Sequence, residues 1–169
     1  KGGPRVRVLV GGGRGVAEIT GGPPAPGVQA NPAHHPVDGS AAGAQEVAII
    51  DDRTLKITSR VGGMRFPDGI AYAPETDKVF VSDESGEADV VIDARTGAKR
   101  STIDLGGQAG NQHYDSVSHC ILVAVQTKNQ MAAIYPVSDT LVQRYALPGA
   151  RHPHRPPIGV PARSALNSP

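Results

Sequence analysis

The chain has 169 residues, a formal net charge of +1 and one cysteine, Cys120. Because Lys and Arg are spread along a nearly neutral chain, the composition gives no electrostatic support for binding nucleic acid or an anionic membrane. No apolar run reaches the roughly 18–20 residues that a membrane-spanning helix needs, and a single cysteine cannot form an intramolecular disulfide.

Residues 1–45 divide into a hairpin and a segment of degenerate pattern. Residues 5–10 and 16–20 are β-prone runs on either side of a glycine-rich turn, GGGRG, which predicts a hairpin. The turn lacks the Lys-Ser/Thr of a phosphate-binding loop, and no helix-forming segment follows it. Residues 23–45 are dominated by Pro, Ala and Gly, which predicts a loop-like segment whose residues 37–39 cannot form a central strand.

From Glu46 onward, short apolar runs alternate with turn signals. No ten-residue segment has a period near 3.6, so the pattern predicts almost no helix. The expected strands share apolar, β-prone sequences and are EVAIID, LKITSRV, IAYA, KVFVS, ADVVID, AKRSTIDL, HYD, CILVAV, QMAAIY and TLVQRYAL.

The pattern is a 42-residue repeat. Ile50 and Asp51 recur as Ile92 and Asp93, and the same offset run backwards places Ser82 on Ser40. Four short strands in a period of about 40–45 residues are typical of a β-propeller blade. The central strands are apolar on both faces, as expected for sheets stacked face to face. A sandwich or a plain meander stays open as an alternative, but neither predicts a fixed period.

The fold prediction is therefore all-β, a partial or small β-propeller of about 3–4 four-stranded antiparallel blades. Residues 1–154 are expected to form a single repeat domain. Residues 155–169 contain two adjacent prolines, which cannot lie in a central strand, so they are expected to be an irregular or disordered tail.

The candidate site residues lie in the loops that lead into the innermost strands. Asp68, Asn111 and His154 follow one another at a regular interval of 43, one more than the strand period. If that slip is real, the three side chains point at a shared axis, where they are plausible ligands for a divalent metal ion. His152 lies two positions from His154, on the same side of an extended segment. The alternative is that all of them are ordinary turn residues.

Other polar residues are interpreted as structural. The acidic residues Asp83, Glu84, Glu87 and Asp89 do not match a calcium-binding loop and are expected to form a solvated turn. Asp93 is expected to accept hydrogen bonds from the ARTG turn that follows it. No serine carries a nucleophile-elbow motif, so no catalytic residue is predicted.

The stretch IAYAPETDKVFVSDES…ADVVIDARTGAKRSTIDLGG resembles the YVTN-type, YncE-like propeller repeat, a WD40-like repeat. The resemblance covers residues 46–154. It implies a bacterial protein with a binding or scaffolding role, often extracytoplasmic or periplasmic, in a ring of about seven blades.

Together these features predict a non-catalytic propeller module, a fragment of a larger propeller, that binds a protein or small-molecule ligand on its loop face. Self-association through open blade edges is expected, and neither nucleic acid nor a membrane span is. The alternative is a metal-assisted propeller enzyme, lactonase-like or of the quinoprotein oxidoreductase type, with a divalent metal ion held by Asp68, Asn111 and His154.

Overall fold

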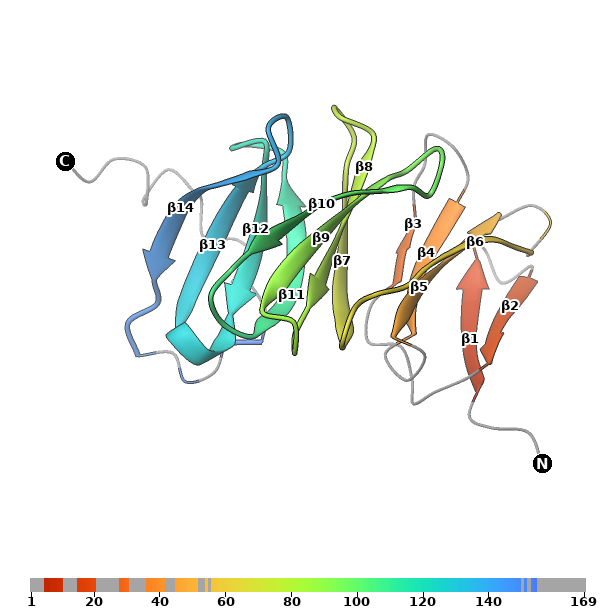
Figure 1. Ribbon diagram of the computed structural model, residues 1–169, viewed down its shortest axis with the longest axis horizontal. Coiled ribbons are helices and arrows are strands. Elements are labelled where there is room, and N and C mark those ends of the chain that lie inside the picture. Colours follow the sequence, from red (N-terminus) through yellow and green to blue (C-terminus); the bar gives the residue numbers. More distant parts are fainter. Residues whose placement is uncertain are drawn as a thin grey trace.

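The computed structural model describes residues 5–10, 15–20, 28–30, 36–41, 45–51, 54, 56–149, 151 and 153–154. Of the residues up to 41 it describes the backbone and not the side chains. The described residues form three four-stranded sheets and one hairpin (Figure 1). The only helical element among them is a 3₁₀ helix at Gln126–Lys128, which confirms the prediction of a nearly helix-free chain. No helix in this part of the chain is long and apolar enough to cross a membrane. The expected irregular tail, residues 155–169, lies outside the described residues.

The strands are β1 (Arg5–Val10), β2 (Gly15–Thr20), β3 (Val28–Ala30), β4 (Pro36–Ala41), β5 (Glu46–Asp51), β6 (Ile57–Val61), β7 (Pro67–Ala73), β8 (Lys78–Asp83), β9 (Ala88–Asp93), β10 (Lys99–Asp104), β11 (Ala109–Asp115), β12 (Cys120–Val125), β13 (Gln130–Tyr135) and β14 (Thr140–Ala146). Each of the three sheets is an antiparallel meander of four consecutive strands, β3–β6, β7–β10 and β11–β14. Figure 1 shows the sheets following one another in a row. This arrangement confirms the partial β-propeller, with each sheet as a blade.

The 42-residue period of the sequence is also the period of the structure. Strand β7 covers residues 67–73 and β11 covers 109–115, and the same offset relates β8 to β12 and β9 to β13. Strand β7 contacts both β11 and β3, so the first strands of the three blades lie next to one another. The first strand of each blade is therefore the innermost one, and its ends define the faces of the arc.

The first blade contains two strands within the segment expected to be loop-like. Residues 36–41 form β4, which lies between β3 and β5 and pairs with both. The expectation that residues 37–39 cannot form a central strand is therefore wrong. Strand pairing depends on backbone hydrogen bonds, which every non-proline residue offers, and the apolar β5 gives the segment a complete partner strand. Strand β4 also ends one full repeat before β8, since the last residue of β4 is Ala41 and that of β8 is Asp83.

The predicted N-terminal hairpin is present as β1 and β2. The two strands pair in register from Arg5 opposite Thr20 to Val10 opposite Gly15. Strand β2 covers residues 15–20 and precedes β10, at 99–104, by two full repeats. The hairpin therefore matches the two outer strands of a blade in its position along the repeat.

The middle blade is buried on both faces, as its apolar strands predicted. Successive side chains of a strand point to opposite faces. Val79 and Val81 accordingly pack with the first blade in one cluster, whereas Phe80 packs with the third blade in another. Phe80 and Val81 have no exposed surface. Stacking of the sheets thus builds the core, and Cys120 is a buried free thiol on the outer face of the third blade.

The turn after β9 is held by Asp93 in the manner predicted. Its carboxylate accepts hydrogen bonds from the backbone N–H and the hydroxyl of Thr96, both at 2.8 Å, and from the Arg95 N–H. Arg100 pairs with the other carboxylate oxygen. These donors lower the pKa of Asp93 well below its ordinary value. At the equivalent position of the first blade, Asp51 binds Thr54 in the same way.

Candidate functional site

Two β-bulges hold Asp68 and Asn111 within the innermost strands β7 and β11, at one end of each, so these residues do not lie in the loops where they were expected. In β7 the register shifts between Pro67 and Ile70, so Asp68 and Gly69 oppose a single residue of β8. In β11 the shift lies at the equivalent place one repeat later, between Ala109 and Gln112, and involves Gly110 and Asn111. Each bulge thus contains one glycine and one polar residue, and bulges commonly redirect a side chain next to a site.

The order of the two bulge residues explains the spacing of 43 between Asp68 and Asn111. The polar residue comes first in β7, as Asp68, and second in β11, as Asn111. The strands keep the 42-residue period, and the polar side chain moves by one position within the bulge. The one-residue slip that the sequence required is therefore a local feature of the backbone.

The three predicted residues meet at this end of the sheets, which we call the channel mouth. His154 Nδ1 lies 3.0 Å from Asn111 Nδ2, and His154 Nε2 lies 3.7 Å from Asp68 Oδ2. The Asn111 backbone N–H also donates to the His154 carbonyl oxygen, at 2.9 Å. The Asp68 side chain is 2% exposed and that of His154 is 54% exposed. The mouth thus joins a buried carboxylate to a histidine that solvent reaches.

A further residue, Glu84, belongs to the mouth. Its backbone N–H donates to the Phe66 carbonyl at 2.9 Å, which ties the β8–β9 loop to the segment leading into β7. Partial burial raises the pKa of Glu84; the charge of Asp68 raises it further and that of His154 lowers it. The two carboxylates therefore interact electrostatically, with His154 beside them.

The third blade has the same arrangement with amides in place of carboxylates. Gln126, which occupies the position of Glu84 in the next repeat, donates its backbone N–H to Gln108 at 2.8 Å, the equivalent of the Glu84–Phe66 bond. The Gln126 side chain is 8% exposed, and its Nε2 has no hydrogen-bond partner among the described atoms. A Cβ placed on Gly110 would lie 3.1 Å from this Nε2 and 2.9 Å from the His154 carbonyl oxygen. Gln126 therefore lies beside the mouth.

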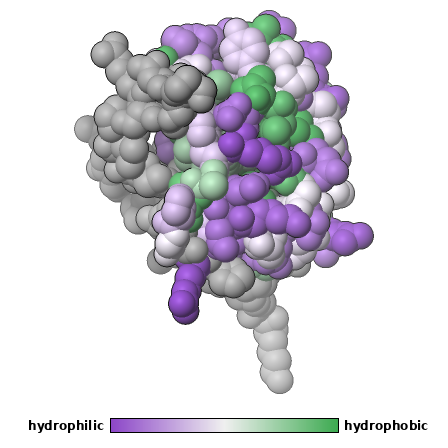
Figure 2. Space-filling model, turned by 90° about the vertical axis from the view of Figure 1, so that its left-hand side faces the viewer, coloured by the Kyte–Doolittle hydropathy of each residue, from purple (hydrophilic) through white to green (hydrophobic). Residues whose placement is uncertain are grey.

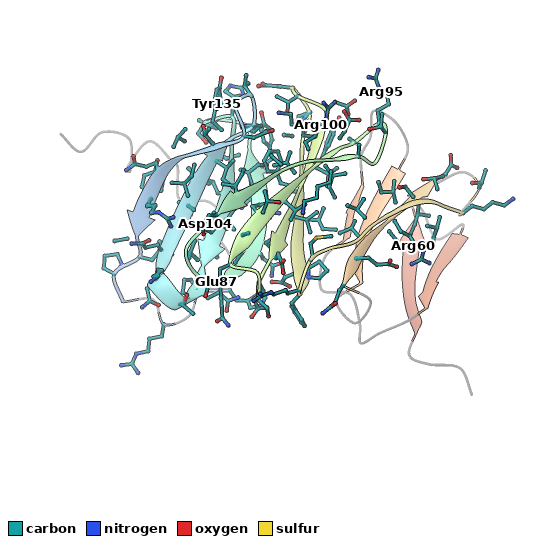
Figure 3. All side chains as sticks on the ribbon, in the orientation of Figure 1. Arg60, Glu87, Arg95, Arg100, Asp104 and Tyr135 are labelled. Carbon is teal, nitrogen blue, oxygen red and sulfur yellow. The ribbon has the colours of Figure 1, made fainter. Side chains whose placement is uncertain are left out.

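The acidic loop predicted to be a solvated turn is only partly so. Asp83 is 6% exposed, and its carboxylate accepts the backbone N–H groups of Arg65, Phe66 and Gly86. Asp89 has no exposed surface, and its burial raises its pKa to about 8. Asp83 is the last residue of β8 and Asp89 lies in β9, so both belong to strands and not to the turn that was expected. Glu87 alone of the four is exposed, at the opposite end of the sheets from Arg95 and Arg100 (Figure 3).

The metal-ion prediction stays a prediction. His152 lies outside the described residues, so its position relative to His154 is not compared. Within the part of the chain that the structure describes, no group of three or more His, Cys, Asp or Glu side chains is arranged to hold a metal ion. Both ring nitrogens of His154 face protein groups, Asn111 and Asp68, so a metal ion bound there would have to displace one of these contacts.

Comparison with known proteins supports the fold. No protein-family model matches the chain, and no curated protein does. Three solved β-propeller structures are similar: the hydrazine synthase of Kuenenia stuttgartiensis (TM-score 0.70, 18% identity, 77% of this chain), the dihydro-heme d1 dehydrogenase NirN in complex with DHE (0.62, 16%, 72%) and Saccharomyces cerevisiae Sqt1 (0.63, 7%, 71%). This chain spans 37%, 28% and 35% of their respective lengths. At these identities the similarity shows the β-propeller fold alone.

Glu84 and Gln126 were missed by sequence reasoning, although a signal for them exists. Both follow the second strand of a blade, and they are one repeat apart with side chains of the same length. The acidic residues around Glu84 hid this equivalence, because a cluster of charges in a loop is usually solvated.

Proposed function

We propose that the chain is a non-catalytic β-propeller binding module that holds a polar ligand at the channel mouth. The observation that carries the proposal is the convergence of Asp68, Asn111 and His154, which belong to successive repeats of the sequence. The side chains of Asp68 and Asn111 both lie within 3.7 Å of the His154 ring. Propellers commonly offer loop clusters at the end of the central channel to ligands. The YVTN-type resemblance, with its extracytoplasmic setting, is consistent with this role.

The site has the chemistry of a binding site. A buried carboxylate, a half-exposed imidazole and two amides provide charge, donors and acceptors within one small region. A small number of precisely placed polar groups fixes the orientation of a ligand in a pocket. Among the described residues, the side chains facing the two ring nitrogens of His154 are Asn111 and Asp68, and neither is a hydroxyl or thiol nucleophile of the kind that a histidine base activates.

The test is binding mapped on the protein. Amino acids, sugars, nucleosides and dicarboxylates are titrated separately into ¹⁵N-labelled protein, and amide shifts are followed in the wild type and in Asp68→Ala and His154→Ala. We expect at least one class to shift the Asn111 amide and to lose affinity in both variants. Glu75→Ala, in the β7–β8 turn at the other end of the blade, is the matched control. Absence of any shift at the mouth with every class would contradict the proposal.

The alternative function, a metal-assisted enzyme, requires a bound metal ion. A metal-assisted enzyme would bind a divalent ion through Asp68, Asn111 and His154 before any chemistry took place. Calorimetric titration with Ca²⁺, Mn²⁺ and Zn²⁺ measures this directly. Binding that Asp68→Ala and His154→Ala both abolish would favour the enzyme, and equal heats in the wild type and the variants would remove its support.

Self-association is the second part of the proposal, with a second copy of the chain as the partner. Among the residues whose side chains the structure describes, four of the five exposed large apolar ones lie in the third blade, at Val117, Tyr135, Val137 and Val142. Figure 2, viewed from the end at which β14 lies, shows hydrophobic surface gathered beside hydrophilic residues. Val142, 50% exposed, lies on β14, which pairs only with β13 among the described strands. An open edge strand is a template for further pairing, and the exposed Val142 adds apolar surface to it.

Light scattering over a range of protein concentrations tests the association. We expect the mass to rise with concentration and Val142→Lys to shift the protein toward the monomer. Thr102→Lys, an exposed position on the outer strand of the middle blade, is the control. A monomer at every concentration would contradict this part of the proposal and leave the ligand site untouched.

A further inference from the structure

The channel mouth is asymmetric in charge, because the second blade places carboxylates there and the third blade places amides there. The two mouth positions of the second blade hold Asp68 and Glu84, and the equivalent positions of the third blade hold Asn111 and Gln126. Each amide has the size and shape of the acid that it matches. The third blade forms the same four-stranded meander with an uncharged pair, so the carboxylates are not required for the fold of a blade.

The carboxylate pair has an energetic cost in the protein alone. Asp68 is 1% exposed, and the pKa of Glu84 is raised by burial and by the charge of Asp68. Two negative charges in a partly dehydrated site repel each other, and a positive group between them relieves that repulsion. His154 lies beside this pair, with its Nε2 3.7 Å from Asp68 Oδ2 and its ring 54% exposed.

A buried donor beside the acids points to a ligand with an oxygen acceptor. Gln126 Nε2 is within a side chain that is more than nine-tenths buried, and it has no hydrogen-bond partner among the described atoms. It lies next to Gly110 and the His154 carbonyl, on the third-blade side of the mouth. An unsatisfied buried donor costs about 1–3 kcal/mol, which a bound acceptor would recover.

From these features we propose that the channel mouth binds a primary ammonium group that carries an oxygen acceptor close to it, with the ammonium at Asp68 and Glu84 and the oxygen at Gln126. The inference rests on the proposed binding function and specifies its ligand class. An ammonium is a compact charge with three donors, which suits two carboxylates on one side of a small site. Free α-amino compounds and the N-termini of proteins share this chemistry.

Glycinamide is the probe, because its ammonium lies next to a carbonyl oxygen. It is titrated into ¹⁵N-labelled protein at neutral pH, beside N-acetylglycinamide, which has no charge, and Nα-acetyl-lysine amide, whose ammonium has no oxygen acceptor next to it. We expect glycinamide to shift the Asn111 and Gln126 signals, with affinity falling as salt is added. The lysine derivative is expected to bind more weakly than glycinamide, and N-acetylglycinamide is expected not to bind.

Variants that give the second blade the chemistry of the third complete the test. Asp68→Asn and Glu84→Gln are each expected to weaken glycinamide binding tenfold or more, and Glu87→Gln, an exposed carboxylate in the same loop, is expected to leave it unchanged. Circular dichroism of each variant confirms that the fold is retained. Equal binding of N-acetylglycinamide, or unchanged affinity in Glu84→Gln, would overturn the inference.

The failure of this inference is distinguishable from failure of the proposed function. If another compound class shifts the mouth signals and no ammonium compound does, the ligand class is wrong and the binding function stands. If Ca²⁺ shifts them and ammonium compounds do not, the mouth is a metal site and the inference is overturned. If nothing shifts them, both are wrong.

Discussion

Gly69 and Asn111 approach so closely that no side chain fits between them. A Cβ built on Gly69 would lie 2.8 Å from the Asn111 Cα atom and 2.9 Å from the backbone nitrogen of Gln112. Both contacts are with backbone atoms, which cannot move aside as a flexible side chain can. The missing side chain therefore allows the innermost strands of the second and third blades to meet next to Asp68 and Asn111.

Gly69→Ala is expected to force β7 and β11 apart and to destabilise the protein by about 1–3 kcal/mol, in the range of core overpacking. Urea unfolding measures the change. Gly62→Ala is the control, because a Cβ there meets nothing within 4 Å and its backbone needs no left-handed conformation. Equal stability of the two variants would contradict the close approach of the strands.

Asp83 fixes the segment that leads into β7, through the backbone N–H groups of Arg65 and Phe66. We expect Asp83→Ala to cost about 2–4 kcal/mol, because several amides lose a charged acceptor. Asp104→Ala, which removes one exposed bond to Gly106, is expected to cost less. Chemical denaturation measures both, and a smaller loss in Asp83→Ala than in Asp104→Ala would contradict the role of Asp83.

Asp93 is expected to make stability sensitive to acid. Its pKa is lowered in the folded state by Arg100 and Thr96, from an ordinary value of 3.8. The contribution is therefore fully present above about pH 4 and is lost as pH falls toward the folded-state pKa. Asp93→Asn is expected to cost about 1–2 kcal/mol at pH 7 and progressively less below pH 4. A difference between variant and wild type that stays constant down to pH 2.5 would argue against this linkage.

Asp89 is expected to make stability depend on pH in the opposite direction from Asp93. Its pKa is about 8 in the folded protein, against 3.8 ordinarily, because burial disfavours its charge. Between these values the folded state holds a proton that the unfolded state has released, so stability falls as pH rises, by at most about 1.4 kcal/mol per pH unit. Asp89→Asn removes this slope and is expected to be more stable than the wild type at pH 8. Glu87→Gln is the exposed control; a wild-type slope matching that of Asp89→Asn would contradict the assignment.

The strands after Glu46 were predictable because their signal is redundant. Apolar alternation, turn residues and the period of 42 all indicate the same boundaries, so the limits of β8, β9 and β12 follow from the sequence to within a residue or two. Strands β7 and β11 begin at Pro67 and Ala109, before the expected IAYA and HYD, because their first residues are polar or glycine-rich and form the bulges. Strand β4 was not predictable from its own residues, since Asp38 and Gly39 have little β propensity. Its place comes from pairing with β5, a relationship that only the repeat offset suggested.

The site was predictable in part for a related reason. The interval of 43 between Asp68 and Asn111 indicated a shared location, but not the bulges that produce it, because a bulge depends on how two strands pair. Glu84 was hidden among acidic neighbours of which Asp83 and Asp89 are buried. Which charge in a cluster faces solvent is decided by the neighbouring blade, and a single loop sequence does not contain that information.

The pKa of Glu84, followed through its carboxyl carbon by NMR, tests the central claim that Asp68 and Glu84 form one coupled pair at the channel mouth. We expect a pKa above the ordinary 4.5 in the wild type and a partial fall toward it in Asp68→Asn, since burial remains when the charge of Asp68 is removed. Asp104→Asn, on the exposed outer strand β10, is expected to leave it unchanged. The same Glu84 pKa in the wild type and in Asp68→Asn would contradict the account.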